Sequence, residues 1–94
     1  MELRNVIWTP VVKNKLTAFS SDRFTSEEKY DFISQLIIET EDILKNPVIG
    51  KTYTEQFGKY KGISRIVVRK LKIYFKQIDN DFVIIGLLFP GENS

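Results

Sequence analysis

Basic residues are concentrated in one stretch of this chain. Residues 59–78 contain seven Lys and Arg and no Asp or Glu, whereas the segments before and after them each carry a net negative charge. The seven are Lys59, Lys61, Arg65, Arg69, Lys70, Lys72 and Lys76. Charge that is segregated in this way favours a polyanionic partner, either nucleic acid or an acidic protein segment. An ordinary solvated face of an antiparallel sheet is the simpler alternative.

We expect this stretch to form a target-binding surface, because phosphates are attracted to a cationic face without any reading of base sequence. Tyr74 and Phe75 lie between lysines, and one of them could stack on a base. Core packing is the stronger expectation for Phe75. The predicted target-binding or nucleic-acid-binding residues are Arg65, Arg69, Lys70, Lys72, Tyr74 and Lys76.

The chain has no cysteine and no histidine. These absences exclude a disulfide, a thiol nucleophile and a zinc–thiolate site, and they remove the usual general base near neutral pH. We expect no cofactor and no metal. Catalysis would have to use carboxylates, lysine, arginine, tyrosine or serine. Lysine, with an ordinary pKa of about 10.4, is a poor base unless neighbouring cations or burial lower that pKa.

Two helix signals occupy the first half of the chain. Thr9-Pro10, after a short apolar strand, is typical of a helix start and predicts a helix to Ser20 or Ser21. Residues 25–28, Thr-Ser-Glu-Glu, form a capping-box pattern that opens a longer helix ending at Asn46-Pro47. The stripe predicted to be buried on the longer helix is Tyr30, Ile33, Leu36, Ile37, Ile43 and Leu44, and its solvated face carries Glu39, Glu41 and Asp42.

The period changes to two in the second half. Alternation over residues 63–69 predicts a strand with Arg65 and Arg69 on one face and Ile66 and Val68 on the other. A second strand is predicted over 72–78, and Asp79-Asn80-Asp81 is typical of a tight turn.

The last strand is predicted over residues 82–89, which are apolar and rich in β-branched side chains without alternation. This composition is typical of a strand that is buried on both faces. We expect Tyr53, Phe57 and Tyr60, in the loop before the strands, to cover one end of the core, and Trp8 to lie at its boundary.

Ninety-four residues, of which 43% are hydrophobic, fit one domain. We therefore expect a single α+β domain over residues 1–94 with the order β-α-α-β-β-β, a helical hairpin packed on a small antiparallel sheet. The predicted core residues are Leu16, Phe19, Ile33, Leu36, Ile37, Val67, Ile73, Phe75, Ile84 and Leu87.

Three short motifs follow one another along the chain. They are Ile7-Trp8-Thr9-Pro10, then Leu44-Lys-Asn-Pro47-Val-Ile-Gly50-Lys51, then Arg65-Ile-Val-Val68 followed by Leu71-Lys-Ile-Tyr-Phe75. With the Asp/Asn turn and the final apolar strand, they resemble the RelE/ParE superfamily of type II toxin–antitoxin toxins. The resemblance extends over about residues 5–92. It implies a growth-inhibiting cytoplasmic toxin, of the kind found in plasmid-stabilisation systems, that a cognate antitoxin neutralises.

The resemblance implies one of two actions. The RelE branch cuts messenger RNA on the ribosome, whereas the ParE branch poisons DNA gyrase and is not a nuclease. At the position where the RelE pattern has a catalytic lysine, this chain has Arg65. Where the pattern has the arginine that stabilises the cleaved phosphate, this chain has Lys72. Three other residues of the pattern are missing here. Its second lysine corresponds to Ile63, its later arginine corresponds to a position near Glu92, and its tyrosine would lie beyond Ser94. The nuclease pattern is therefore incomplete.

We accordingly expect a ParE-like or catalytically degenerate toxin that binds a macromolecular target, DNA gyrase or the ribosome with its messenger RNA. One alternative is an active RelE-type mRNA interferase using Arg65, Lys72 and Lys76. Another is a non-catalytic nucleic-acid-binding module. Glu92 is expected to be a poor base, because the short tail after Leu88 should not hold it in place.

The sequence also predicts a cytoplasmic protein without a membrane partner. The first residues do not have the pattern of a signal peptide, and the longest apolar run, residues 82–90, is too short for a bilayer crossing.

Overall fold

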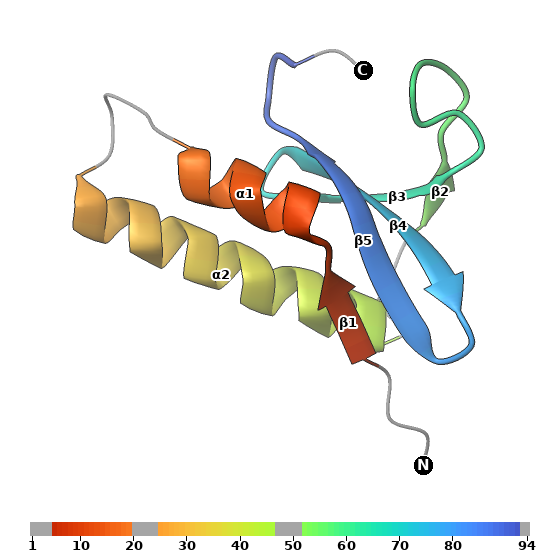
Figure 1. Ribbon diagram of the computed structural model, residues 1–94, viewed down its shortest axis with the longest axis horizontal. Helices are drawn as coiled ribbons and strands as arrows, with labels where there is room; N and C mark the ends of the chain where they lie inside the picture. Colours follow the sequence, from red (N-terminus) through yellow and green to blue (C-terminus); the bar gives the residue numbers. More distant parts are fainter. Residues whose placement is uncertain (1–4, 20–24, 47–51, 93–94) are drawn as a thin grey trace.

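The structure is a computed structural model that describes residues 5–19, 25–46 and 52–92. Its elements in chain order are β1 (Asn5–Trp8), α1 (Pro10–Ala18), α2 (Ser26–Lys45), β2 (Tyr53–Thr54), β3 (Ser64–Val68), β4 (Leu71–Ile78) and β5 (Asp81–Leu88). Figure 1 shows α1 and α2 running side by side in opposite directions beside a twisted sheet. The α+β class, the helical hairpin and the following antiparallel strands β3, β4 and β5 agree with the sequence prediction.

The sheet itself differs from the predicted one. It has five strands in the order β1-β5-β4-β3-β2, and β1 pairs with β5 in parallel, so the sheet is mixed and not antiparallel throughout. The chain leaves β1 directly into α1, and Thr9 at this junction donates hydrogen bonds from its backbone N–H and its Oγ1 to the carbonyl of Ile84 in β5. This contact fixes β1 alongside β5. The two-residue strand β2 is too short for a periodicity signal.

The helix boundaries follow local chemistry. Pro10 begins α1, but the Thr9 hydroxyl bonds to Ile84 and does not cap the helix, and α1 ends at Ala18, before the predicted Ser20 or Ser21. The capping box of α2 is confirmed: the Glu28 N–H donates to Thr25 Oγ1, and the Thr25 N–H donates to Glu28 Oε1. The Asn46 cap ends α2 as expected. The Pro47 stop, with Gly50 and Lys51 of the second motif, lies outside the described residues.

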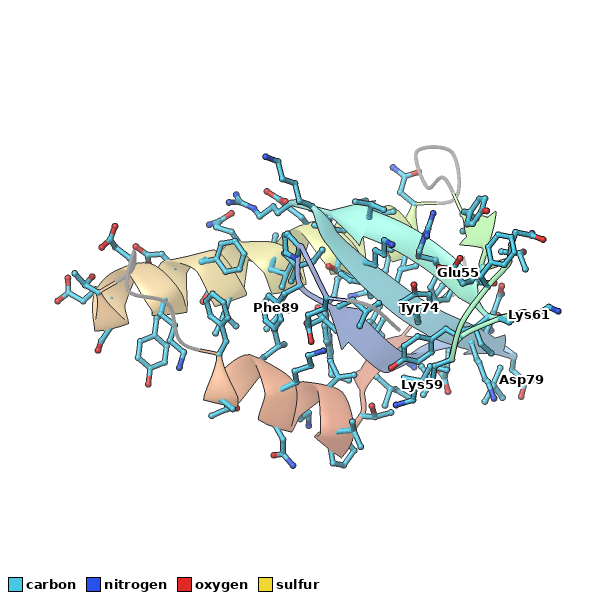
Figure 2. All side chains as sticks on the ribbon, turned by 90° about the horizontal axis from the view of Figure 1, so that it is seen from above. Glu55, Lys59, Lys61, Tyr74, Asp79 and Phe89 are labelled. Carbon is cyan, nitrogen blue, oxygen red and sulfur yellow. The ribbon has the colours of Figure 1, made fainter. Side chains whose placement is uncertain are left out.

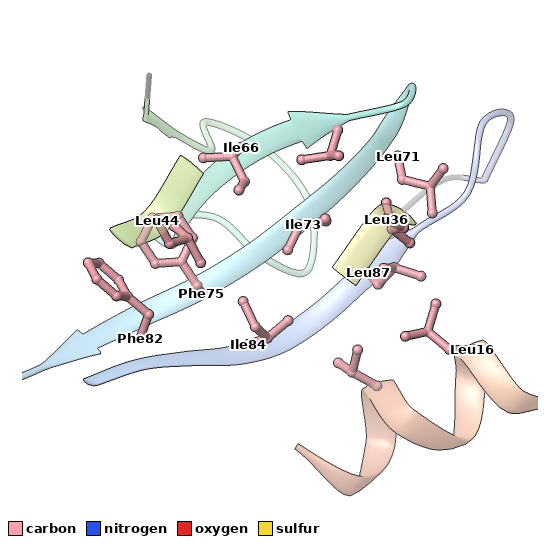
Figure 3. Packing of buried hydrophobic residues seen from close by; sticks show 12 residues of the cluster. Leu16, Leu36, Leu44, Ile66, Leu71, Ile73, Phe75, Phe82, Ile84 and Leu87 are labelled. Atoms are coloured by element: carbon pink, nitrogen blue, oxygen red, sulfur yellow. The ribbon is translucent and has the colours of Figure 1, made fainter. Parts of the chain in front are cut away.

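The core lies between the helical hairpin and one face of the sheet (Figure 3). Ile66, Ile73 and Leu87 stand opposite one another in β3, β4 and β5, and they form the centre of this face. Six of the ten predicted core residues are buried, namely Leu16, Leu36, Ile73, Phe75, Ile84 and Leu87. Three more, Phe19, Ile33 and Ile37, are half-buried.

Two predictions of burial are wrong: that of Val67 in the core and that of Tyr30 in the stripe of α2. Val67 is 55% exposed because its neighbours Ile66 and Val68 point to the helices, and the pleat turns every second side chain away from them. Tyr30 is 73% exposed and lies beside the groove between α1 and α2. Trp8 is half-buried against the core, as expected for a boundary residue.

Strand β5 lies between β1 and β4 and is largely buried on both faces, which confirms the sequence prediction. Ile84 and Leu87 belong to the core on the helix side. Gly86 and Leu88 lie on the opposite face of the strand and are buried as well. Neither described helix combines the length and the apolar character that a bilayer crossing needs.

Candidate nucleic-acid interface

The sheet face opposite the helices, called the open face here, receives the basic side chains of β3 and β4. Core residues Ile73 and Phe75 point to the helices, so Lys72, Tyr74 and Lys76 point the other way. Arg65 joins them, because it stands opposite Tyr74 in the β3–β4 pairing. Four of the six predicted binding residues therefore do share one face.

Arg65 lies in an internal ion pair on this face. Its NH1 donates to Glu55 Oε2 at 2.9 Å, and the two side chains are only 18% and 11% exposed. The guanidinium also lies 4.3 Å from the ring centroid of Tyr53, its strand partner in β2. The Arg65 Nε is buried and has no hydrogen-bond partner among the described residues. Arg65 was predicted to be a cation available to bind phosphate. The structure contradicts this, because the guanidinium is already paired with the carboxylate of Glu55.

Tyr74 is fully buried, which corrects its predicted place on the target surface. Its ring stacks on that of Tyr60, with the centroids 4.1 Å apart, and its hydroxyl donates to Glu55 at 2.7 Å. Gly86, opposite Tyr74 in β5, makes room for this stack: a Cβ there would lie 2.3 Å from the Tyr60 hydroxyl. A base cannot stack on Tyr74 while Tyr60 covers it.

The cluster has a defined protonation state. The hydrogen bond from Tyr74 lowers the pKa of Glu55 below its ordinary value, with Arg65 contributing in the same direction. Burial raises the pKa of Tyr74, and its bond to Glu55 raises it further. Near neutral pH, Glu55 is consequently an ionised carboxylate and Tyr74 a protonated phenol, and the pair holds the start of the loop against β3 and β4.

Arg69 is also paired, with a residue that was predicted to be merely solvated. Its Nε and NH2 donate to the two oxygens of Glu39 on α2 at 3.0 and 2.9 Å. This hydrogen bonding raises the pKa of Arg69. Arg69 and Lys70 form the two-residue β3–β4 turn with φ of 51° and 71°, as type I′ hairpin turns require. The pairing ties the hairpin to the helix, so Arg69 is removed from the predicted target surface.

The lysines are the cations that stay available. Lys70, Lys72 and Lys76 are exposed, and none of them takes part in an ion pair within the described part of the chain. Lys59 and Lys61, in the loop between β2 and β3, are exposed as well. Figure 2 shows both loop lysines at the same end of the sheet as Glu55 and Tyr74.

Sequence reasoning counted Lys59 and Lys61 in the basic stretch but did not assign them to the surface. The loop reaches the sheet because Gly58 and Gly62 adopt φ of 82° and 84°, and because Glu55 and Gly62 form a backbone hydrogen bond that closes it. Two glycines that bracket Lys-Tyr-Lys are the signal that could have indicated a compact turn. The three loop aromatics were predicted to cover one end of the core, but Tyr60 instead covers Tyr74 on the open face, and Tyr53 is 46% and Phe57 is 79% exposed.

Glu92 is held firmly, contrary to the prediction. It accepts hydrogen bonds from the Phe89 N–H at 2.7 Å and from Lys15 Nζ on α1 at 3.1 Å. The bond from Phe89 lowers its pKa most, and Lys15 adds to the effect. Glu92 is thus held in a fixed position, but its lowered pKa makes it a weak proton acceptor. No group of three or more metal-binding side chains occurs among the residues that the structure describes.

Comparison with known proteins gives no relative for this chain: no family model matches it, and neither a curated protein nor a solved structure does. The RelE/ParE resemblance accordingly rests on the motifs alone, and the open face is the feature that supports a function.

Proposed function

We propose that this chain is a toxin of the RelE/ParE kind that acts by binding a polyanionic macromolecule and does not cleave it. The observation that carries the proposal is a set of exposed lysines on β4, its turn and the loop that have no carboxylate partner within residues 5–19, 25–46 and 52–92. They are Lys59, Lys61, Lys70, Lys72 and Lys76. Two acidic residues flank this set in the sequence: Glu55, which is already paired with Arg65, and Asp79, which is exposed just after Lys76. The helical hairpin followed by antiparallel strands is consistent with the resemblance.

The arrangement of the other polar groups speaks against catalysis. Cleavage of RNA needs a base for the ribose hydroxyl, a cation on the phosphate and a proton donor for the leaving oxygen. Arg65 and Arg69, the arginines of the basic stretch, are occupied by carboxylates, and the lowered pKa values of Glu55 and Glu92 make these two carboxylates weak bases. Tyr74 is buried beneath Tyr60 and cannot reach a substrate.

A ribonuclease is the second candidate, and one observation favours it. Glu55 lies within hydrogen-bond distance of both Arg65 and Tyr74, so a carboxylate, a guanidinium and a phenol meet at one point. These groups could serve as base, phosphate ligand and acid if the Tyr60 loop moved away. This candidate uses Arg65, as the sequence suggested, but with Glu55 and Tyr74 in place of Lys72 and Lys76.

Purified protein added to a translating extract separates the two candidates. We expect messenger RNA to stay intact, as read from the mapped 5′ ends of a reporter transcript. Codon-positioned cuts that disappear with Glu55→Gln and with Arg65→Lys would establish the ribonuclease and overturn the non-catalytic proposal.

The toxin proposal also requires an antitoxin, and a groove between α1 and α2 offers a place for it. The groove has a volume of about 440 Å³, an apolar floor that includes Leu16, Ile33 and Ile37, and Lys13 and Lys29 at its rim. An amphipathic helix with an acidic flank matches this combination of apolar and positive surface. We propose that the antitoxin places such a helix here and extends an acidic segment towards the open face.

Co-expression with the product of the adjacent reading frame checks the partner. We expect one complex on size-exclusion chromatography, and Lys13→Glu, which reverses an exposed charge at the groove's rim without touching the core, should weaken it. Two independent peaks at micromolar concentration for the unaltered pair would count against the antitoxin.

A further inference from the structure

Two aromatic side chains stand out in solvent beside the cationic surface. Phe57 is 79% exposed and Tyr53 is 46% exposed, and both belong to the short segment that also carries Lys59 and Lys61. A single exposed aromatic residue has no meaning by itself. Aromatic rings next to lysines, however, form the combination with which proteins hold unpaired bases and their phosphates.

The pairing of strands places one of these rings on the open face. Tyr53 stands opposite Arg65 in the β2–β3 ladder, and Arg65 stands opposite Tyr74 in the β3–β4 ladder. Tyr53, Arg65 and Tyr74 therefore form one row across the sheet. The Arg65 guanidinium lies against the Tyr53 ring, at 4.3 Å from its centroid, and this cation–π contact holds the ring in place.

The acidic residue bonded to this row, Glu55, does not oppose an anionic ligand strongly. Glu55 is 89% buried at its side chain and is bonded to both Arg65 and Tyr74, so its charge is compensated inside the protein. The cations that face solvent around it, Lys59 and Lys61, have no such compensation among the described residues. The surface offered to a ligand combines these lysines with the exposed parts of the Phe57 and Tyr53 rings, and the exposed carboxylate of Asp79 lies at the same end of the sheet (Figure 2).

We propose that Tyr53 and Phe57 stack on bases of a single-stranded nucleic acid whose phosphates contact Lys59 and Lys61. The inference rests on the proposed function, because it assumes that the open face binds the target, and it specifies the class of that target. A duplex offers its phosphates and base edges but hides the base faces on which an aromatic ring could stack. A single strand offers both, and stacking of one base typically changes affinity by roughly tenfold.

Fluorescence anisotropy with two labelled probes tests the inference: an unstructured oligouridine of about 12 nucleotides, within known single-strand site sizes, and a duplex of equal length. We expect tighter binding of the single strand. Phe57→Ala and Tyr53→Ala should each weaken it by roughly fivefold to tenfold and leave duplex binding unchanged. Tyr30→Ala is the matched control, since Tyr30 is 73% exposed on α2. It should bind like the wild type.

Equal affinity for the two probes, or unchanged single-strand binding by both aromatic variants, would overturn this inference. If Lys72→Ala with Lys76→Ala still abolished binding in that case, the cationic face would stand without base stacking. If neither probe bound at all, the proposed function itself would fail. Circular dichroism of each variant should match the wild type, because both aromatic side chains face solvent.

Discussion

Leu36→Ala should lower the free energy of unfolding by about 2–5 kcal/mol, the range measured for large-to-small changes at fully buried leucines. Leu36 has no exposed area and lies in the cluster between α2 and the sheet, together with Ile73 and Leu87. Truncation removes apolar contacts on all sides, and the sheet cannot follow α2 into the space without breaking its register. Chemical denaturation of the purified protein measures the loss.

Ile38→Ala on the same helix is the control. Ile38 is 52% exposed, so the same kind of truncation should cost about 0.5–1 kcal/mol or less. A loss below about 0.5 kcal/mol for Leu36→Ala, or equal losses for the two variants, would mean that α2 is rotated and presents another face to the sheet.

The parts of the fold that follow from neighbouring residues were predictable. The Thr25–Glu28 capping box and the alternation of β3 each depend on a few consecutive side chains, and both are present as expected. The same alternation should have excluded Val67 from the core. The parallel pairing of β1 with β5 was not predictable, since residues 76 positions apart, such as Asn5 and Asp81, meet in it.

The candidate site shows the same division. The basic stretch and the shared face of its side chains could be predicted from composition and from the two-residue period. The ion pairs of its arginines could not, because their partners are distant in the sequence. Glu39 and Arg69 are 30 residues apart, and the contact depends on how α2 lies on the sheet. The burial of Tyr74 depends on a loop that folds back over Gly86. Neither contact leaves a periodic signal in the sequence.

Lys72→Ala combined with Lys76→Ala should weaken binding to any polyanion by roughly 50-fold at about 0.1 M salt. Each lysine that contacts a phosphate contributes about 0.9 to the slope of log affinity against log salt, so the double variant should lower that slope by about two. Both side chains are exposed on β4 and point away from the core, so folding should be unaffected. A salt titration followed by anisotropy measures both quantities.

Lys13→Ala combined with Lys45→Ala is the matched control, because it removes the same charge from exposed positions on the helices. It should reduce affinity and salt slope only slightly. Equal losses in the two double variants would show that net charge, and not the open face, governs binding.

Growth of a bacterial host after induced expression tests most directly that the open face is the surface through which the protein acts. The wild type and the Lys13/Lys45 control should stop growth while messenger RNA stays intact. The Lys72/Lys76 variant, at the same soluble level, should leave growth normal. Undisturbed growth with the wild type, or arrest by the Lys72/Lys76 variant equal to that by the wild type, would contradict the account.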